Sequence, residues 1–150
     1  MTACTVRVGV AADRPWLLSI DRHVSAEWVD RTLAMDGYLV AEVGGTRVGF
    51  LRHSLFWGRV PFMDEIQVDP AYRRSGVGTS LFTRWEADSL ARGALVLMTS
   101  SQSDEPEPQA WHRRNGFVDS GSLTFGAYQR TPEQFFIKDL SGGADPCLPD

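Results

Sequence analysis

The segment from Phe62 to Gly93 constrains the fold of this 150-residue chain more than any other. A short apolar run is followed by a polar turn with two closely spaced glycines, and then by apolar residues at helical spacing. A strand, a glycine turn and a helix in this order direct the backbone N–H groups of the turn at one point, where the helix dipole adds positive charge. This arrangement predicts a binding site for a phosphate group.

The spacing of the glycines distinguishes between kinds of phosphate site. A dinucleotide-binding fingerprint needs a third glycine three residues after the second, and Leu81 occupies that position. The lysine–serine pair that follows the last glycine of a P-loop is also missing. Both of these common phosphate-binding motifs are therefore disfavoured.

The segment from Ile66 to Thr79 resembles the signature of the GNAT superfamily, the acetyl-CoA-dependent N-acetyltransferases. The core of that signature is Arg or Gln, two residues, Gly, one residue, and Gly or Ala, and Arg73, Gly76 and Gly78 match it in place. The resemblance implies that acetyl-CoA is the cosubstrate and that backbone N–H groups hold its pyrophosphate. The cofactor-binding residues that it implies are Arg73, Arg74, Ser75, Gly76, Val77, Gly78 and Thr79, together with Val68, whose N–H would polarise the thioester carbonyl.

Composition excludes several other classes of protein. With 43% hydrophobic and 23% charged residues, the chain has the profile of a soluble globular protein. A net charge of -4 argues against a nucleic-acid partner and suits a cationic acceptor. No apolar run reaches the roughly 18 residues of a membrane span. The two cysteines, Cys4 and Cys147, are either joined in a disulfide or unpaired in a reducing compartment, and the simpler second interpretation predicts a cytoplasmic protein.

The remaining sequence predicts six further strands and three further helices, and Gly44-Gly45 predicts a hairpin between two of the strands. Strands are predicted over 5–11, 38–43, 47–56, 94–99, 117–125 and 134–140, and helices after a cap at Asp13, over 26–35 with a cap at Ser25, and over 109–115. Residues 100–108 are predicted to form a polar loop. The resemblance implies an α/β GNAT fold, with a mixed, mostly antiparallel sheet of about seven strands, about four flanking helices, and central strands that splay to admit acetyl-CoA. Residues 1–140 would form one domain, and 141–150 a mobile tail.

Two adjacent carboxylates are candidates for the acceptor chemistry. An alkylammonium must lose a proton before it attacks a thioester, and Asp64 and Glu65 lie just before Val68. Neighbouring strand residues face opposite sides of a sheet, so at most one is expected to face the acceptor. We favour Asp64, because it matches the position of a functional carboxylate in spermidine/spermine and aminoglycoside acetyltransferases. Each could instead bind the amine by charge alone or be an ordinary surface carboxylate.

A histidine is the candidate proton donor for the departing thiolate. Residues 110–117 resemble a later motif of the family, in which many members carry a tyrosine that protonates coenzyme A. That tyrosine is missing here, and the spacing before Gly116 and Phe117 places His112 at the corresponding position. We hypothesise that His112 is the general acid. The alternatives are a purely structural histidine and a cofactor contact.

The sequence therefore predicts direct transfer of acetyl from acetyl-CoA to a primary amine, without a covalent enzyme intermediate. The expected acceptor is a small cationic amine, such as a polyamine, an aminoglycoside or an amino-acid derivative. Two alternatives stay open: acetylation of a protein N-terminus or lysine, and a non-catalytic acyl-CoA sensor. No metal site is predicted, since His53 has no second ligand at suitable spacing. Because dimers are frequent in the family, a homodimer is possible.

Overall fold

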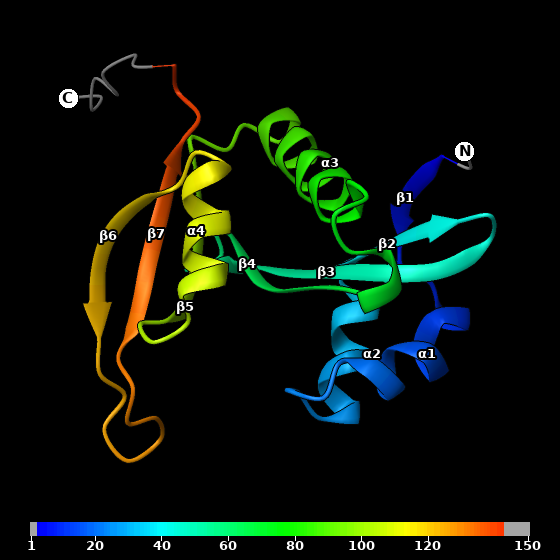
Figure 1. Ribbon diagram of the computed structural model, residues 1–150, viewed down its shortest axis with the longest axis horizontal. Helices are drawn as coiled ribbons and strands as arrows, with labels where there is room; N and C mark the ends of the chain where they lie inside the picture. The colour runs from blue at the N-terminus through cyan, green and yellow to red at the C-terminus, as the bar shows by residue number, and fades with distance from the viewer. Residues whose placement is uncertain (1–2, 143–150) are drawn as a thin grey trace. The chain divides into compact units, whose positions relative to one another are not determined.

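The computed structural model describes residues 3–142, which contain seven strands and four α-helices (Figure 1). The strands are β1 (Cys4–Val8), β2 (Tyr38–Val43), β3 (Thr46–Phe56), β4 (Val60–Val68), β5 (Val96–Gln102), β6 (Val118–Leu123) and β7 (Glu133–Asp139). The α-helices are α1 (Arg14–Ile20), α2 (Ala26–Ala34), α3 (Val77–Ala91) and α4 (Pro106–Arg114), and two 3-10 helices are η1 (Ala11–Asp13) and η2 (Pro70–Tyr72). Most of the predicted tail, and Cys147, lie outside the described residues.

The strands form one sheet in the order β1-β2-β3-β4-β5-β7-β6. The β1/β2, β2/β3, β5/β7 and β6/β7 pairs are antiparallel. β4 and β5 are parallel, with Phe62 opposite Met98 and Met63 opposite Thr99. The predicted GNAT architecture, a mixed and mostly antiparallel sheet with flanking helices, is thereby confirmed. The splay of the central strands stays a prediction.

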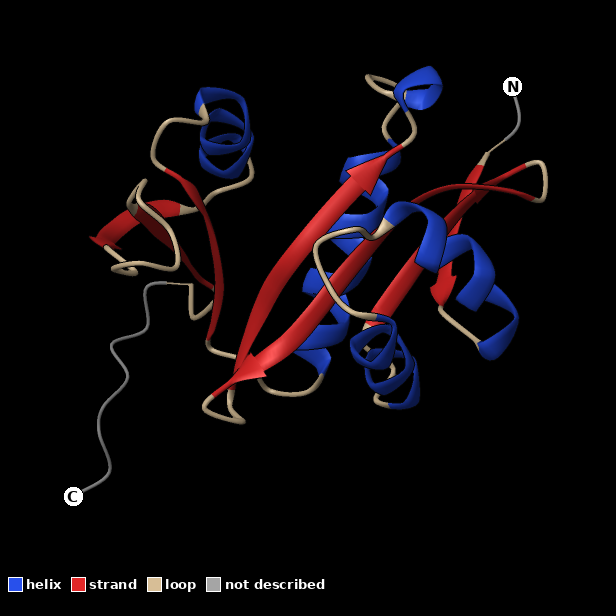
Figure 2. Cartoon of the chain, turned by 90° about the horizontal axis from the view of Figure 1, so that it is seen from below, coloured by secondary structure: helices blue, strands red, loops and turns tan. Residues whose placement is uncertain are grey.

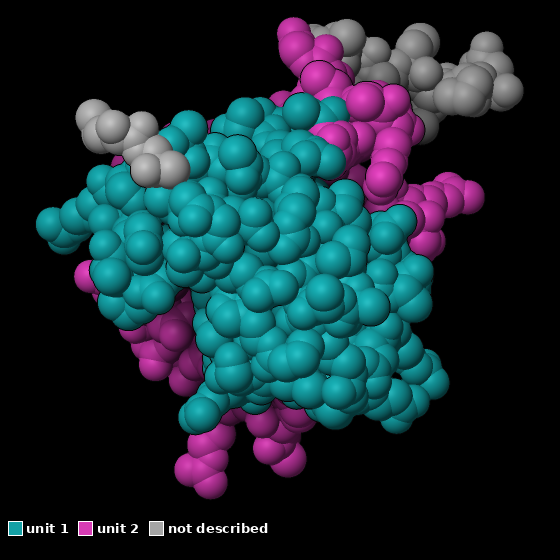
Figure 3. Space-filling model, turned by 90° about the vertical axis from the view of Figure 1, so that its right-hand side faces the viewer, with its two compact units in different colours: residues 1–54, 64–87 teal, residues 55–63, 88–150 magenta. Residues whose placement is uncertain are grey.

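The chain divides into two compact units (Figure 3). The first comprises residues 1–54 and 64–87, and the second comprises residues 55–63 and 88–150. Each unit is described by itself below. None of the helices in residues 3–142 is long and apolar enough to cross a lipid bilayer.

The core of the first unit lies between two helices and the strands β2 and β3. Leu17, Val29, Tyr38 and Phe50 are fully buried there. Figures 1 and 2 show α1 and α2 on one face of β2 and β3, and α3 on the opposite face. Helix α2 begins as predicted, because the Ser25 hydroxyl accepts a hydrogen bond from the Trp28 N–H at 3.2 Å.

The predicted helix cap at Asp13 is wrong. Its side chain does not cap α1 but is fully buried in an ion cluster. The carboxylate accepts hydrogen bonds from Arg7 Nη1 and Nη2 at 2.7 and 2.8 Å, and from Arg47 Nε at 2.7 Å. The Val10 N–H donates a fourth, also at 2.7 Å. These contacts hold the pKa of Asp13 well below its usual range, chiefly through the hydrogen bonds from Arg7.

The second unit contains β5, β6, β7 and α4, and β5 extends further than predicted. Ser100 and Gln102 belong to β5 because they pair with Phe135 and Glu133 of β7, so the predicted loop over 100–108 is wrong at its start. It is also wrong at its end, since α4 already begins at Pro106, a proline position typical of a first helical turn. The apolar run over 94–99 suggests a strand buried on both faces, but burial alternates along β5 and contradicts this expectation.

Candidate active site

The glycine turn follows β4 through a short capped segment of the first unit. The Asp69 carboxylate accepts a hydrogen bond from the Ala71 N–H at 2.8 Å, which caps η2, and the Asp69 N–H donates to the Val48 carbonyl at 2.8 Å. Arg73 Nε lies 3.4 Å from the Val68 carbonyl oxygen. The end of β4 and the start of the turn are therefore tied both to β3 and to each other.

The turn itself requires a glycine. Gly76 has φ +88°, a conformation that costs an L-residue roughly 1 kcal/mol or more, and the preceding Arg74 also adopts a positive φ of +61°. A Cβ built on Gly76 would have no atom within 4 Å, so the space beside it is open. Residues 73–76 are exposed. The requirement for glycine is thus one of backbone conformation, and the turn leaves room for a ligand.

A run of free backbone donors lines this turn. Within residues 3–142, no backbone carbonyl accepts a hydrogen bond from the N–H groups of residues 74–79. Helix α3 begins at Val77, and the first N–H groups of a helix have no acceptor within it. The first helical bond joins the Ser80 N–H to the Gly76 carbonyl at 2.9 Å. The 15-residue helix adds its dipole at the same end. Free donors and a positive dipole in an open turn fit a diphosphate.

Gly49 of β3 brings the sheet close to the start of α3. A Cβ at Gly49 would lie 2.7 Å from the Gln67 carbonyl oxygen and 3.3 Å from Val77 Cγ1. A side chain at this position would therefore push against the backbone of β4 next to Val68. The absence of one lets the end of β4 and the first turn of α3 pack directly on β3.

Asp64 lies on β4 with its side chain 20% exposed. The Ser54 hydroxyl donates a hydrogen bond to Asp64 Oδ1 at 3.0 Å, and Arg52 Nη1 lies 3.8 Å from Oδ2. Burial raises the pKa of Asp64, whereas the Ser54 hydrogen bond and the Arg52 charge lower it. The net direction is upward, which suits a carboxylate that must take a proton from an amine.

Glu65 has a related electrostatic environment. Its pKa is raised, chiefly by burial, while His23, Arg52 and a hydrogen bond from Gln67 act in the opposite direction. Arg52 therefore acts on both carboxylates. Which of Asp64 and Glu65 faces the acceptor stays a prediction.

The structure adds a buried polar cluster that sequence reasoning missed. Arg52 Nε donates to Asp21 Oδ2 at 2.8 Å, and the Tyr38 hydroxyl donates to the same oxygen at 2.6 Å. Tyr38 and Asp21 are 0 and 2% exposed, and Arg52 is 6% exposed. The one signal in the sequence was an arginine inside the apolar β3 run, two positions after Phe50 and hence on the same face.

His112 belongs to the second unit, on α4, and is only 5% exposed. Its ring centroid lies 5.1 Å from that of Phe136 and 6.0 Å from that of Phe117, and Nδ1 has no hydrogen-bond partner in residues 3–142. Burial, with a smaller contribution from the Arg113 charge, lowers the pKa of His112 to about 4. The imidazole is therefore neutral near pH 7. The hypothesis that His112 is the general acid stays a prediction.

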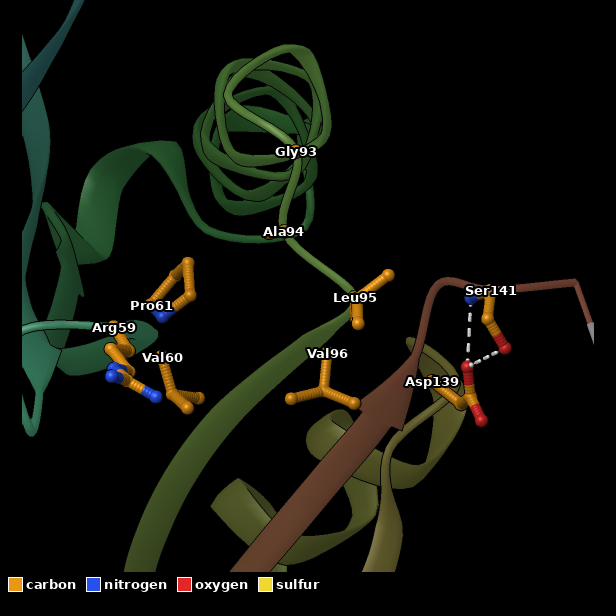
Figure 4. Close-up of a pocket in the computed structure, with 9 residues that line it drawn as sticks. All are labelled: Arg59, Val60, Pro61, Gly93, Ala94, Leu95, Val96, Asp139 and Ser141. Carbon is orange, nitrogen blue, oxygen red and sulfur yellow. Dashed lines mark hydrogen bonds between the residues drawn. The ribbon is translucent and has the colours of Figure 1, made fainter. Parts of the chain in front are cut away.

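A pocket of about 390 Å³ also lies in the second unit (Figure 4). Its lining comes from the start of β4, the segment that leads into β5, and the end of β7: Arg59, Val60, Pro61, Gly93, Ala94, Leu95, Val96, Asp139 and Ser141. The Asp139 carboxylate accepts hydrogen bonds from the Ser141 N–H and hydroxyl at 2.7 and 2.6 Å, drawn as dashed lines. None of the predicted site residues lines this pocket.

Comparison with known families identifies the class of protein. A family model described as an acetyltransferase (GNAT) domain matches residues 35–119, which is more than half of the chain. The matched region contains the glycine turn, both candidate carboxylates and His112. The chain belongs to this family of GNAT acetyltransferases. Among curated proteins, none matches the chain.

Solved structures share the same fold at low sequence identity. Ard1 from Thermoplasma volcanium superposes with a TM-score of 0.80 at 19% identity, over 91% of this chain and 97% of that chain. The ribosomal-protein-S18-alanine N-acetyltransferase from Escherichia coli superposes with a TM-score of 0.79 at 18% identity, over 99% of this chain and 100% of that chain. The yncA structure from Salmonella typhimurium was solved with its cofactor acetyl-CoA. It superposes with a TM-score of 0.71 at 20% identity, over 98% of this chain and 99% of that chain. These likenesses show the fold.

Proposed function

We propose that this protein is an N-acetyltransferase that transfers the acetyl group of acetyl-CoA to a primary amine. The observation that carries the proposal is the run of free N–H donors over residues 74–79 in an open turn at the start of α3. Acetyl-CoA is the cosubstrate, in keeping with the family and with the acetyl-CoA in the yncA structure. The turn would hold the diphosphate of acetyl-CoA, and the Val68 N–H would polarise the thioester carbonyl.

The reaction needs a neutral amine. The nitrogen lone pair forms the new C–N bond, the C–S bond breaks, and its electron pair leaves on sulfur. Asp64 is our candidate for the group that takes the amine proton, directly or through water, because its pKa is raised and it is partly exposed. Glu65 is the second candidate for this role. The thiolate in turn gains a proton, for which His112 is the candidate donor.

A small cationic amine is the acceptor class that these charges favour. Asp64 and Glu65 place two carboxylates on β4, and the Arg52 charge is already paired with Asp21. The chain as a whole carries a net charge of -4. A protein N-terminus is the second candidate, suggested by the E. coli structure, whose protein acetylates an alanine of a ribosomal protein. A homodimer stays a prediction.

Release of free coenzyme A thiol tests the proposal. Purified protein and acetyl-CoA would be incubated with polyamines, aminoglycosides, amino acids and peptides that begin with alanine. We expect turnover with one acceptor class, and that class distinguishes the small-amine proposal from the protein N-terminal alternative. Binding of acetyl-CoA by folded protein without thiol release on any acceptor would instead favour the acyl-CoA sensor.

A further inference from the structure

The buried cluster around Arg52 is more elaborate than a single ion pair. Asp21 follows the last residue of α1, and its side chain is fully buried. Its Oδ2 atom accepts hydrogen bonds from the Tyr38 hydroxyl on β2 and from Arg52 Nε on β3. Three elements of the first unit therefore fix the position of one carboxylate. Because the hydroxyl of the fully buried Tyr38 ties Asp21 in place, that carboxylate has little freedom to move.

This anchoring determines where the Arg52 guanidinium lies. Its short contact is the 2.8 Å hydrogen bond to Asp21, and Nη2 adds a longer one of 3.5 Å to Asp21 Oδ1. The distance from Nη1 to Asp64 Oδ2 is 3.8 Å, which is beyond hydrogen-bond range. Arg52 thus acts on Asp64 as a nearby charge and makes its hydrogen bonds to Asp21.

The arrangement leaves Asp64 with unused acceptor capacity. Only Ser54 donates a hydrogen bond to its side chain among residues 3–142, and that bond goes to Oδ1. Oδ2 has no donor within hydrogen-bond distance in the same part of the chain. A carboxylate can accept about four hydrogen bonds. A free arginine beside it would normally form a bidentate pair and use this capacity.

We propose that Asp21 is a positioning residue, which holds the Arg52 guanidinium away from Asp64 and so keeps Asp64 Oδ2 free for the ammonium group of the acceptor. This inference rests on the proposed function, since it assigns the acceptor amine to Asp64. Asp21 touches neither substrate in this account. It acts chiefly through Arg52, and its own charge adds a smaller direct effect on the pKa of Asp64.

The charges around Asp64 set the sign of the expected effect. The groups that act on it are Arg52 and Ser54, from β3, and Asp21, at the end of α1. Arg52 lowers the pKa of Asp64 and Asp21 raises it. Replacing Asp21 by Asn removes the negative charge and also releases Arg52 to pair with Asp64. Both effects lower the pKa of Asp64, whereas Arg52→Gln raises it.

An NMR titration of the Asp64 side-chain carboxyl carbon, combined with steady-state kinetics, tests this proposal. In Asp21→Asn we expect the pKa of Asp64 to fall by about one pH unit or more. The KM for the amine should rise about tenfold, with the KM for acetyl-CoA unchanged. In Arg52→Gln the pKa should move upward, because a nearby positive charge is lost. Asp21→Asn added to Arg52→Gln should lower the pKa of Asp64 much less than Asp21→Asn does alone, because no guanidinium is then released, whereas a direct charge effect of Asp21 would be the same in both backgrounds. Asp30→Asn, which removes the exposed carboxylate that pairs with Arg14, is the matched control and should leave all of these values unchanged.

Tyr38→Phe provides a second test that keeps the buried ring. It deletes only the hydroxyl that fixes Asp21, so we expect a smaller shift in the same direction as Asp21→Asn. An unchanged pKa of Asp64 in folded Asp21→Asn, or in Tyr38→Phe if the first variant does not fold, would overturn the proposal. The titration needs no turnover. A shifted pKa in a protein that acetylates no amine would contradict the proposed function and leave the positioning role intact.

Discussion

The Ser54 hydroxyl donates a hydrogen bond to Asp64 Oδ1 at 3.0 Å, from one strand of the sheet to the next. This contact stabilises the ionised carboxylate, and it opposes the effect of burial on the pKa of Asp64. The balance among burial, this hydrogen bond and the charges of Arg52 and Asp21 sets the pH at which Asp64 can accept a proton. Asp64 is therefore the residue whose substitution should be most informative.

We expect Asp64→Asn to lower kcat/KM for the acceptor by about 10²- to 10⁴-fold, the usual contribution of a general base, without changing the KM for acetyl-CoA. Because a base works when ionised, activity of the wild type should fall as the pH drops below the raised pKa of Asp64. Ser54→Ala removes the hydrogen bond that lowers this pKa, so that fall should begin at a higher pH. If Glu65→Gln gives the large loss and Asp64→Asn does not, Glu65 and not Asp64 is the group that takes the amine proton.

Gly76→Ala should weaken acetyl-CoA binding. The substitution strains a residue at φ +88°, and the added methyl group occupies the open space where a diphosphate would lie. We expect at least a tenfold rise in the Kd for coenzyme A, measured by calorimetry. Gly45→Ala is the matched control, because Gly45 has φ +78° and an equally open Cβ position in the β2–β3 hairpin. Equal loss of affinity in both variants would contradict the assignment of the turn.

His112 should make stability depend on pH. Its pKa is lowered to about 4 in the folded protein, against about 6.5 in the unfolded chain, so the unfolded chain binds more protons between these values. The stabilisation is present above pH 6.5 and should be lost, by about 3 kcal/mol, as the pH falls to 4. Urea unfolding at several pH values measures it. His112→Phe, which keeps an aromatic ring, should show a flatter dependence over this range, and an equally steep one would contradict the burial of a neutral imidazole.

The activity of His112→Gln tests whether His112 is the general acid that protonates the departing thiolate. As a general acid of pKa about 4, His112 would be scarcely protonated near pH 7, so wild-type kcat should rise as the pH is lowered toward the raised pKa of Asp64, below which protonation of Asp64 reduces activity. Loss of that rise in His112→Gln, with coenzyme A affinity retained, is the result expected of a proton donor. Unchanged turnover in the variant would contradict the hypothesis and leave His112 a structural residue.

Asp13→Asn should destabilise the first unit. The substitution removes a fully buried carboxylate from between Arg7 and Arg47, and we expect a loss of about 2 to 3 kcal/mol in the free energy of unfolding. Since the folded pKa of Asp13 is depressed, its contribution is present above about pH 4 and lost on further acidification. Denaturant unfolding at pH 7 and pH 3 measures both effects. A variant as stable as the wild type at pH 7 would contradict this account.

Local patterns in the sequence predicted the elements that depend on local chemistry. The cap at Ser25, the β2–β3 hairpin and the glycine turn each depend on residues within a few positions of one another. The end of β5 was missed because Ser100 and Gln102 are polar and become strand only through their register with β7. That register is a tertiary property.

The charged partners of the site residues could not be predicted from the sequence, because their pairing also depends on tertiary structure. Arg52 and Asp21 are 31 positions apart, and Asp13 and Arg47 are 34 apart. Their pairing depends on how α1 and η1 pack on the sheet, which no spacing in the sequence encodes. Asp64 could be selected from its distance to the glycine turn, but its free Oδ2 atom could be recognised only once Arg52 was placed.

The fate of the acetyl group tests the central claim most directly. Acetyl-CoA labelled with carbon-13 in its acetyl group would be incubated with the protein and the acceptor panel, and the products analysed by mass spectrometry. The account predicts labelled acetyl on the nitrogen of one acceptor class, dependent on Asp64 or Glu65. Label that stays in bound acetyl-CoA with folded wild-type protein, on every acceptor, would contradict it and favour a protein that binds acetyl-CoA without transferring its acetyl group.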